Sequence, residues 1–213
     1  MKKSLISILV LIMVLSSVFM LACKEPTEEV IPAPAPEGVE AESLGEYGKV
    51  TLSFGAFSDI HFSSVCDKQV KEYYPKALAD IMKQTGNRLS AVTVSGDFSE
   101  GFAADYDTLI QYTIARVGDE VPLIASYGNH EGNGIHFQYE TKFDNPVDNV
   151  TVVNGYNFIC VGAHSGDTYT EEQAEWLDEQ LATMTAADPD KPVFILIHHP
   201  VKGTHDDWTQ VDG

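Results

Sequence analysis

The chain has 213 residues, and its 32 acidic residues against 13 basic ones give a formal net charge of −19. A negative field of this size repels nucleic acid and anionic lipid, so we expect no nucleic-acid-binding surface. Three cysteines are too few for a disulfide framework, and they lack the spacing of a structural zinc site.

The N-terminal end has the pattern of an export signal. Lys2 and Lys3 precede an apolar run that ends at Cys23, and a basic start, an apolar middle and a small final residue are typical of secretory signals. Residues 20–23 resemble the lipobox of bacterial lipoproteins. This resemblance implies that residues 1–22 are removed and that Cys23 is lipidated, which would anchor the protein to a membrane of the cell envelope. An uncleaved anchor and plain secretion remain alternatives.

Residues 23–48 are rich in proline and glutamate and predict an extended spacer between the anchor and a folded domain. Removal of residues 1–22 takes away two lysines and no acidic residue, so the mature net charge becomes −21. Residues 49–213 remain, which is the size of one domain with its own core.

Strand-like and helix-like segments alternate from residue 49 onward. The pattern first predicts strands over 50–57, 89–94 and 121–125, which alternate with helices over 71–84 and 105–117, and Pro75 lies near the start of the first helix. It then predicts a hairpin over 150–162 that turns at Asn154 and Gly155. A helix that begins with a capping box at Thr170 and a strand over 192–197 complete the series. This alternation predicts an α/β fold, a β-sandwich with a mixed sheet flanked by helices.

The stretch 132–149 is expected to be the longest loop, where substrate specificity commonly resides. Its aromatic residues Tyr139 and Phe143 would either pack the loop onto the domain or stack on the ring of a substrate. Packing is the favoured interpretation.

Polar clusters follow four of the predicted strands. In chain order they are Asp59 with His61, Asp97, Asn129 with His130, and His198 with His199. Each cluster by itself is as consistent with a loop, a turn or a hydrogen-bonded histidine as with a site. Because open α/β sheets bind ligands beyond the carboxyl ends of their strands, we expect the four clusters to meet at one edge.

Carboxylate, imidazole and amide groups of this kind suit manganese, iron or zinc. Two such ions about 3.5–4 Å apart clamp a phosphate group and ionise a water molecule between them. A carboxylate that bridges the ions would offset their mutual repulsion, and Asp97 is the natural candidate for this position.

The motifs, in order, resemble the signature of the calcineurin-like metallophosphoesterases over about residues 50–205. They are Asp59-x-His61, Gly96-Asp97, Gly128-Asn129-His130-Glu131 and His198. The resemblance implies the calcineurin-like phosphoesterase fold and the hydrolysis of phosphomonoesters or phosphodiesters. The attacking group would be a hydroxide bound to two divalent or trivalent metal ions.

The same resemblance implies a role for each residue. One metal ion would be held by Asp59, His61 and Asp97, and the other by Asp97, Asn129 and His198. His130 would contact the phosphate and protonate the leaving oxygen. Glu131 would orient His130.

Two departures from relatives change the expectation. Glu100 stands where purple acid phosphatases carry a tyrosine ligand, so an iron–tyrosinate enzyme is not expected. The Gly-His-x-His motif that ends the family's ligand set is missing, because the element at residues 203–206, with His205, has another spacing and is interpreted as an active-site loop. We therefore expect the chain to be truncated at its C-terminus, to bind metal weakly and to show little turnover, and we expect hydrolysis from the full-length protein.

Two other functional classes remain open. One is a surface-displayed binding or scaffold protein on a degenerate phosphoesterase fold, which the missing histidines favour and the four intact motifs oppose. The other is a solute-binding lipoprotein, which fits the anchor and spacer but has no use for aspartate, asparagine and histidine at four strand ends. A Gly-His-x-His motif encoded beyond residue 213 would decide for the enzyme.

Overall fold

The computed structural model of the protein describes residues 50–63, 68–131, 136–163 and 169–200. The predicted signal peptide and spacer lie outside the described residues, as do Cys23, Cys66 and the loop around His205. No helix in the described part is long and apolar enough to cross a membrane.

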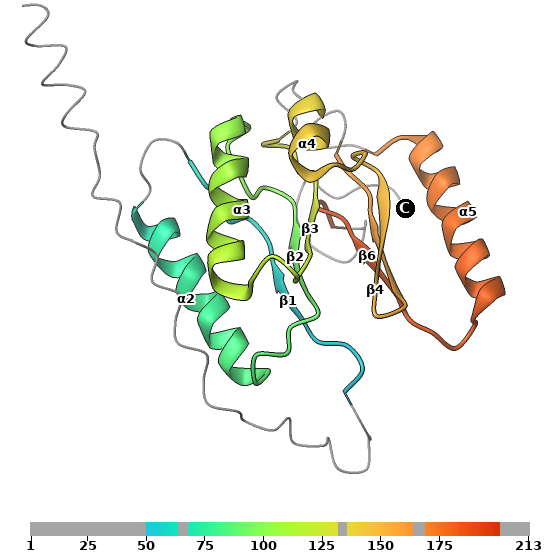
Figure 1. The fold of residues 1–213 in the computed structure, drawn as a ribbon. Coiled ribbons are helices and arrows are strands. Elements are labelled where there is room, and N and C mark those ends of the chain that lie inside the picture. The colour runs from blue at the N-terminus through green and yellow to red at the C-terminus, as the bar shows by residue number, and fades with distance from the viewer. Residues whose placement is uncertain (1–49, 64–67, 132–135, 164–168, 201–213) are drawn as a thin grey trace, which may run out of the picture. The chain divides into compact units, whose positions relative to one another are not determined.

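Three parallel strands form the first sheet, in the order β1 (Phe54–Phe57), β2 (Ala91–Ser95) and β3 (Leu123–Ser126). The crossovers between them are the helices α2 (Lys68–Gln84) and α3 (Ala103–Val117), which lie on the same side of the sheet (Figure 1). The central strand β2 is apolar and almost entirely buried, as expected for a parallel strand covered on both faces.

The second sheet is mixed. Strands β4 (Asn149–Val153) and β5 (Tyr156–Cys160) form an antiparallel hairpin, and β6 (Val193–Leu196) pairs with β5 in parallel. Helix α5 (Glu171–Ala187) connects β5 to β6 and lies beside the second sheet, away from α2 and α3 (Figure 1). The predicted mixed β-sandwich flanked by helices is confirmed.

Two apolar clusters hold these layers together. The larger one joins the first sheet to α2, α3 and the short helix α4 (His136–Phe143), and its fully buried members include Leu78, Val92, Val94, Phe98, Tyr106 and Leu109. The smaller one lies between the two sheets and contains Ala91, Ile124, Val153, Phe158, Cys160 and Leu196. The first sheet is therefore covered on both faces, which fixes the strand ends that carry the polar clusters.

Helix α4 is an element that the sequence pattern did not predict. It lies inside the stretch 132–149, which was expected to be a loop. Tyr139 is 1% exposed and donates its hydroxyl hydrogen to the carbonyl oxygen of Ala125 on β3. The packing role of Tyr139 is confirmed, and stacking of this ring on a substrate is excluded by its burial.

The other predicted elements are confirmed with small shifts at their ends. Helix α2 begins at Lys68 rather than at residue 71, so Pro75 lies about two turns inside it. Helix α5 begins as predicted, because the hydroxyl of Thr170 accepts from the Gln173 amide at 3.2 Å and the Gln173 side chain accepts from the Thr170 amide at 3.1 Å. Asn154 and Gly155 both have positive φ, as a two-residue hairpin turn requires.

Candidate functional site

The polar clusters lie at the carboxyl ends of β1, β2, β3 and β6, as expected. Asp59 and His61 follow β1, and Asp97 follows β2. His130 follows β3, while His198 arrives from the second sheet after β6. Asn129, which precedes His130, is half-buried at the same strand end.

Asp97 is the centre of this group and is 4% exposed. Its Oδ2 atom lies 3.1 Å from Nε2 of His198, 3.8 Å from Nε2 of His130 and 3.9 Å from Nε2 of His61. Its other oxygen, Oδ1, accepts a hydrogen bond from the backbone amide of His130 at 3.0 Å. Three imidazoles from three strand ends therefore converge on one carboxylate oxygen.

The donor atoms form two groups that share Asp97. One group is His61, Asp97 and His130, and the other is Asp59, Asp97 and His198, with the donor atoms of each group within 4.8 Å of one another. The shared position of Asp97 is the one that a bridging ligand would occupy. The division differs from the one that the family resemblance implied, which placed Asp59 and His61 on one ion.

Three of the candidate ligands have left-handed backbone conformations. The φ angles of Asp59, His61 and Asp97 are 53°, 52° and 49°. Such conformations are uncommon for residues other than glycine, and they gather at functional sites where surrounding contacts hold them. The amides of Asp59 and His61 donate to the carbonyl oxygens of Gly96 and Asp97 at 3.2 and 2.9 Å, so the two loops fix one another.

Two glycines make room for the ligands. A Cβ atom on Gly96 would lie 2.7 Å from atoms of the His198 ring, and one on Gly128 would lie 2.3 Å from Oδ1 of Asp97. Neither distance is tolerated between non-bonded atoms, so both positions exclude any side chain. The Gly-Asp and Gly-Asn-His motifs are thus explained by the close approach of Asp97 and His198 to the backbone.

Glu131 is fully buried beneath the ligands and holds two loops together. Its carboxylate accepts hydrogen bonds from the amides of Asp97, Ser99 and Gly128 at 2.8–2.9 Å and from the Ser99 hydroxyl at 2.9 Å. Burial raises the pKa of this carboxyl group to about 7, against the effect of these donors. Its contacts therefore fix the backbone on both sides of the site.

The carboxylate at the His130 ring is that of Glu100. Its Oε2 atom lies 2.9 Å from Nδ1 of His130, and its Oε1 atom lies 3.1 Å from Nδ1 of His61. The orienting role of Glu131 stays a prediction, and Glu100 is a second carboxylate that contacts the His130 ring directly. From the sequence, Glu100 was predicted only as the residue in place of a tyrosine ligand, and its position three residues beyond Asp97 was the available signal.

The electrostatics of the site favour positive charge. Burial lowers the pKa of His198, but the hydrogen bonds to Asp97 and to the Ser95 carbonyl oxygen and the charges of Asp97 and Asp59 together bring the value to about 9. Burial also lowers the pKa of His130, but the hydrogen bond to Glu100 and the negative charges of the nearby carboxylates together raise it above the usual value. For Asp97, burial raises the pKa, but the contacts with His198 and His130 leave the value below the usual range.

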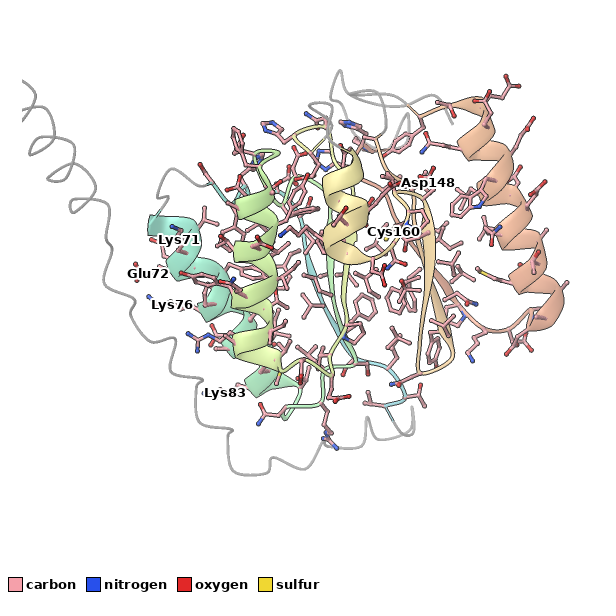
Figure 2. All side chains as sticks on the ribbon, turned by 45° about the horizontal axis from the view of Figure 1, so that its top comes forward. Lys71, Glu72, Lys76, Lys83, Asp148 and Cys160 are labelled. Carbon is pink, nitrogen blue, oxygen red and sulfur yellow. The ribbon has the colours of Figure 1, made fainter. Side chains whose placement is uncertain are left out.

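A group of carboxylates and imidazoles that stabilises positive charge fits divalent or trivalent cations, and these donors suit manganese, iron or zinc. Asp59, His61, Asp97 and His198 all offer donor atoms at the shared edge. Cys160, the cysteine that the described residues contain, is buried at the end of β5 near Asp148 (Figure 2) and belongs to neither donor group. The donor set is therefore of the oxygen and nitrogen type.

His199 lies next to the site but differs from its neighbour. Its side chain is 4% exposed, and its ring packs 4.8 Å from the ring of His198. It belongs to neither of the two donor groups.

The chain was also compared with known proteins. The model of the family described as calcineurin-like phosphoesterase matches residues 52–212, which is more than half of the chain. No curated protein sequence matches it. The matched segment contains every strand end described above.

Proposed function

The chain belongs to the calcineurin-like phosphoesterases, and from this premise we propose that it hydrolyses phosphate esters with the help of two bound metal ions. One observation carries the proposal. Three imidazoles and the carboxylate of Asp59 surround a single buried carboxylate, Asp97, at the carboxyl ends of strands from both sheets.

The residues that would hold metal ions in the proposed enzyme are Asp59, His61, Asp97, Asn129 and His198, and Asp97 is common to both donor groups. When bound, the ions would lower the pKa of a water molecule and neutralise charge on the phosphate oxygens. The protein supplies the fixed geometry. Glu131 and the glycines beside Asp97 hold this carboxylate where both donor groups reach it.

His130 is the proposed proton donor. Glu100 accepts the Nδ1 hydrogen of His130, so Nε2 is the nitrogen that faces Asp97 and the site. The water oxygen forms a new bond to phosphorus, the ester P–O bond breaks, and the leaving oxygen takes a proton from Nε2 of His130. This proton transfer is general acid catalysis.

The substrate class follows from charge. The protein is strongly acidic, and Lys71, Lys76 and Lys83 lie on α2 rather than at the strand ends (Figure 2). Bound ions would supply positive charge for a phosphate group at the strand ends. We propose small phosphomonoesters or phosphodiesters as substrates.

Hydrolysis of p-nitrophenyl phosphate and of its bis ester tests the proposal. We expect turnover with added manganese, iron, zinc or cobalt, and its loss after exhaustive chelation. Activity that survives chelation would refute metal dependence. Metal binding without turnover of any phosphate ester would instead support a binding protein on a phosphoesterase fold.

A further inference from the structure

The backbone of His198 leaves the second sheet just before the site. The last backbone hydrogen bond between the ends of β5 and β6 runs from the amide of Val161 to the carbonyl oxygen of Leu196, at 3.0 Å. Beyond this point the amides of His198 and His199 both donate to the hydroxyl oxygen of Tyr169, at 3.0 and 3.3 Å. One tyrosine side chain thus replaces a neighbouring strand as the acceptor for two consecutive amides.

Tyr169 is itself held by the start of α5. The next residue, Thr170, is the helix N-cap, and its partner in the capping box is Gln173. The side-chain nitrogen Nε2 of Gln173 also donates to Oδ1 of Asp148 at 2.9 Å and to the carbonyl oxygen of Gly162 at 2.8 Å. Gln173 is the buried residue of α5, so the first turn is the part of this helix that is tied to the second sheet.

The ring of His198 is held from the other side. Its Nδ1 atom lies 3.0 Å from the carbonyl oxygen of Ser95 on β2, and its Nε2 atom lies 3.1 Å from Oδ2 of Asp97. The first sheet therefore fixes the ring, while Tyr169 fixes the backbone that carries it. Among the candidate ligands in the described residues, His198 is the one that the second sheet contributes.

We propose that Tyr169 is a positioning residue that sets His198 for metal binding. The inference rests on the proposed function, since it assigns a support to one ligand of the same site. Loss of the hydroxyl would leave two amides without their acceptor, and the backbone of His198 would shift to find water or another partner. Groups that orient a metal ligand from behind have large effects on metal affinity.

Tyr169→Phe tests this role, with Tyr74→Phe as the matched control. Tyr74 donates or accepts one hydrogen bond with Thr113 at 2.8 Å between α2 and α3, so the control also removes a buried hydroxyl. Zinc is titrated into each protein with ¹⁵N-labelled histidine, and the ring nitrogen signals of His198 and His61 are followed by NMR. For Tyr169→Phe we expect His198 to need roughly 10- to 100-fold more zinc, with His61 unchanged. Tyr74→Phe should match the wild type at both histidines.

A general loss of stability would change the zinc requirement of both histidines or of neither. An equal increase in the zinc needed by His198 and by His61 would therefore overturn the inference. Unchanged titration of His198 in Tyr169→Phe would overturn it as well. If the variant does not fold, amide hydrogen exchange of the metal-free wild type tests instead whether Tyr169 accepts hydrogen bonds from the amides of His198 and His199. The amides of His198 and His199 should be protected, and rapid exchange at both would refute the assignment. A wild type that binds no zinc but protects both amides would refute the proposed function instead, and with it the purpose assigned to Tyr169.

Discussion

At the scale of single residues, the neighbours of Asp97 differ in their contacts. Asp97 lies between both donor groups, whereas His130 has one ring nitrogen against Glu100 and the other toward Asp97. The structure places His130 in one donor group with His61. A ligand and a proton donor respond differently to substitution, so their roles can be separated by experiment.

Asp97→Asn should abolish metal binding and turnover together, because the amide lacks the charge that lets two cations lie close to each other.

His130→Gln should retain the metals and lower kcat by roughly 10²–10⁴-fold for alkyl phosphates. The loss should be small for p-nitrophenyl phosphate, whose leaving group hardly needs a proton. Metal content by mass spectrometry and rates on both substrates are the measurements, with Asp178→Asn on the exposed face of α5 as control. Loss of metal in His130→Gln would make His130 a ligand.

Glu100→Gln should lower kcat more than KM for alkyl phosphates. The two carboxylate oxygens contact Nδ1 of His61 and Nδ1 of His130 separately, and an amide offers an acceptor oxygen to only one of them. We expect a loss of about 10- to 100-fold, with Glu175→Gln on α5 as the control. Rates equal to those of the wild type would show that the contacts of Glu100 do not matter for turnover.

At the scale of elements, the ends of the strands determine the site and their glycines determine how closely the loops approach. The positions of these ends were predictable, because an apolar run followed by Gly-Asp or Gly-Asn-His is a local pattern. The contacts of Glu100 with His130 and of Tyr169 with His198 were not predicted, since they join segments that are 30 and 29 residues apart in the chain. Helix α4 was not predicted, because the contact between Tyr139 and Ala125 on β3 is not visible in the local sequence pattern.

Gly128→Ala should disrupt the loop after β3. The new methyl group would meet the backbone nitrogen of Asp97 at 2.4 Å and its Oδ1 at 2.3 Å, so the loop must move. We expect the free energy of unfolding to fall by about 1–3 kcal/mol and metal affinity to fall with it, measured by urea denaturation and metal titration. Gly55→Ala on β1 is the control, because its methyl group would meet only side chains, at 3.4 Å. Equal stability of the two variants would contradict the packing described here.

Cys160 on β5 should resist thiol reagents in the folded protein. Burial, and to a smaller extent Asp148, raises the pKa of its thiol from 9.0 to about 12. The reactive thiolate is therefore scarce below that pH, and labelling in the native state should be slow at pH 8 and rise toward pH 12. Because the folded protein favours the neutral thiol, Cys160 adds its full contribution to the free energy of unfolding below pH 9.0. This contribution is lost as the pH rises from 9.0 to about 12. Peptide mapping after iodoacetamide treatment, with and without urea, measures the labelling, and fast native labelling at pH 8 would contradict the burial.

At the scale of the whole molecule, the net charge and the N-terminal sequence pattern bear on how the protein could attach to a membrane. The net charge of −19 opposes adsorption to anionic lipid. We propose that membrane attachment depends on a covalent lipid at Cys23 and that the proteolytically matured chain begins there.

Cys23→Ser should release the protein from the membrane fraction or stall the removal of residues 1–22, because lipidation requires the thiol. Cys66→Ser is the matched control and should fractionate like the wild type. Cell fractionation and mobility on a denaturing gel are the measurements. Fractionation and mobility unchanged by Cys23→Ser would remove the support for a lipoprotein.

The contact of His198 with the first sheet also has a consequence for the timing of assembly. Ser95 and His198 touch although they lie 103 residues apart in the chain, and contacts between such distant segments close late in folding. A chain that crosses a membrane N-terminus first delivers Asp59, His61 and Asp97 before His198 emerges. If the chain is exported as we propose, Asp97 and His198 would come together only after His198 has crossed, and any metal ions would then be taken up outside the compartment of synthesis.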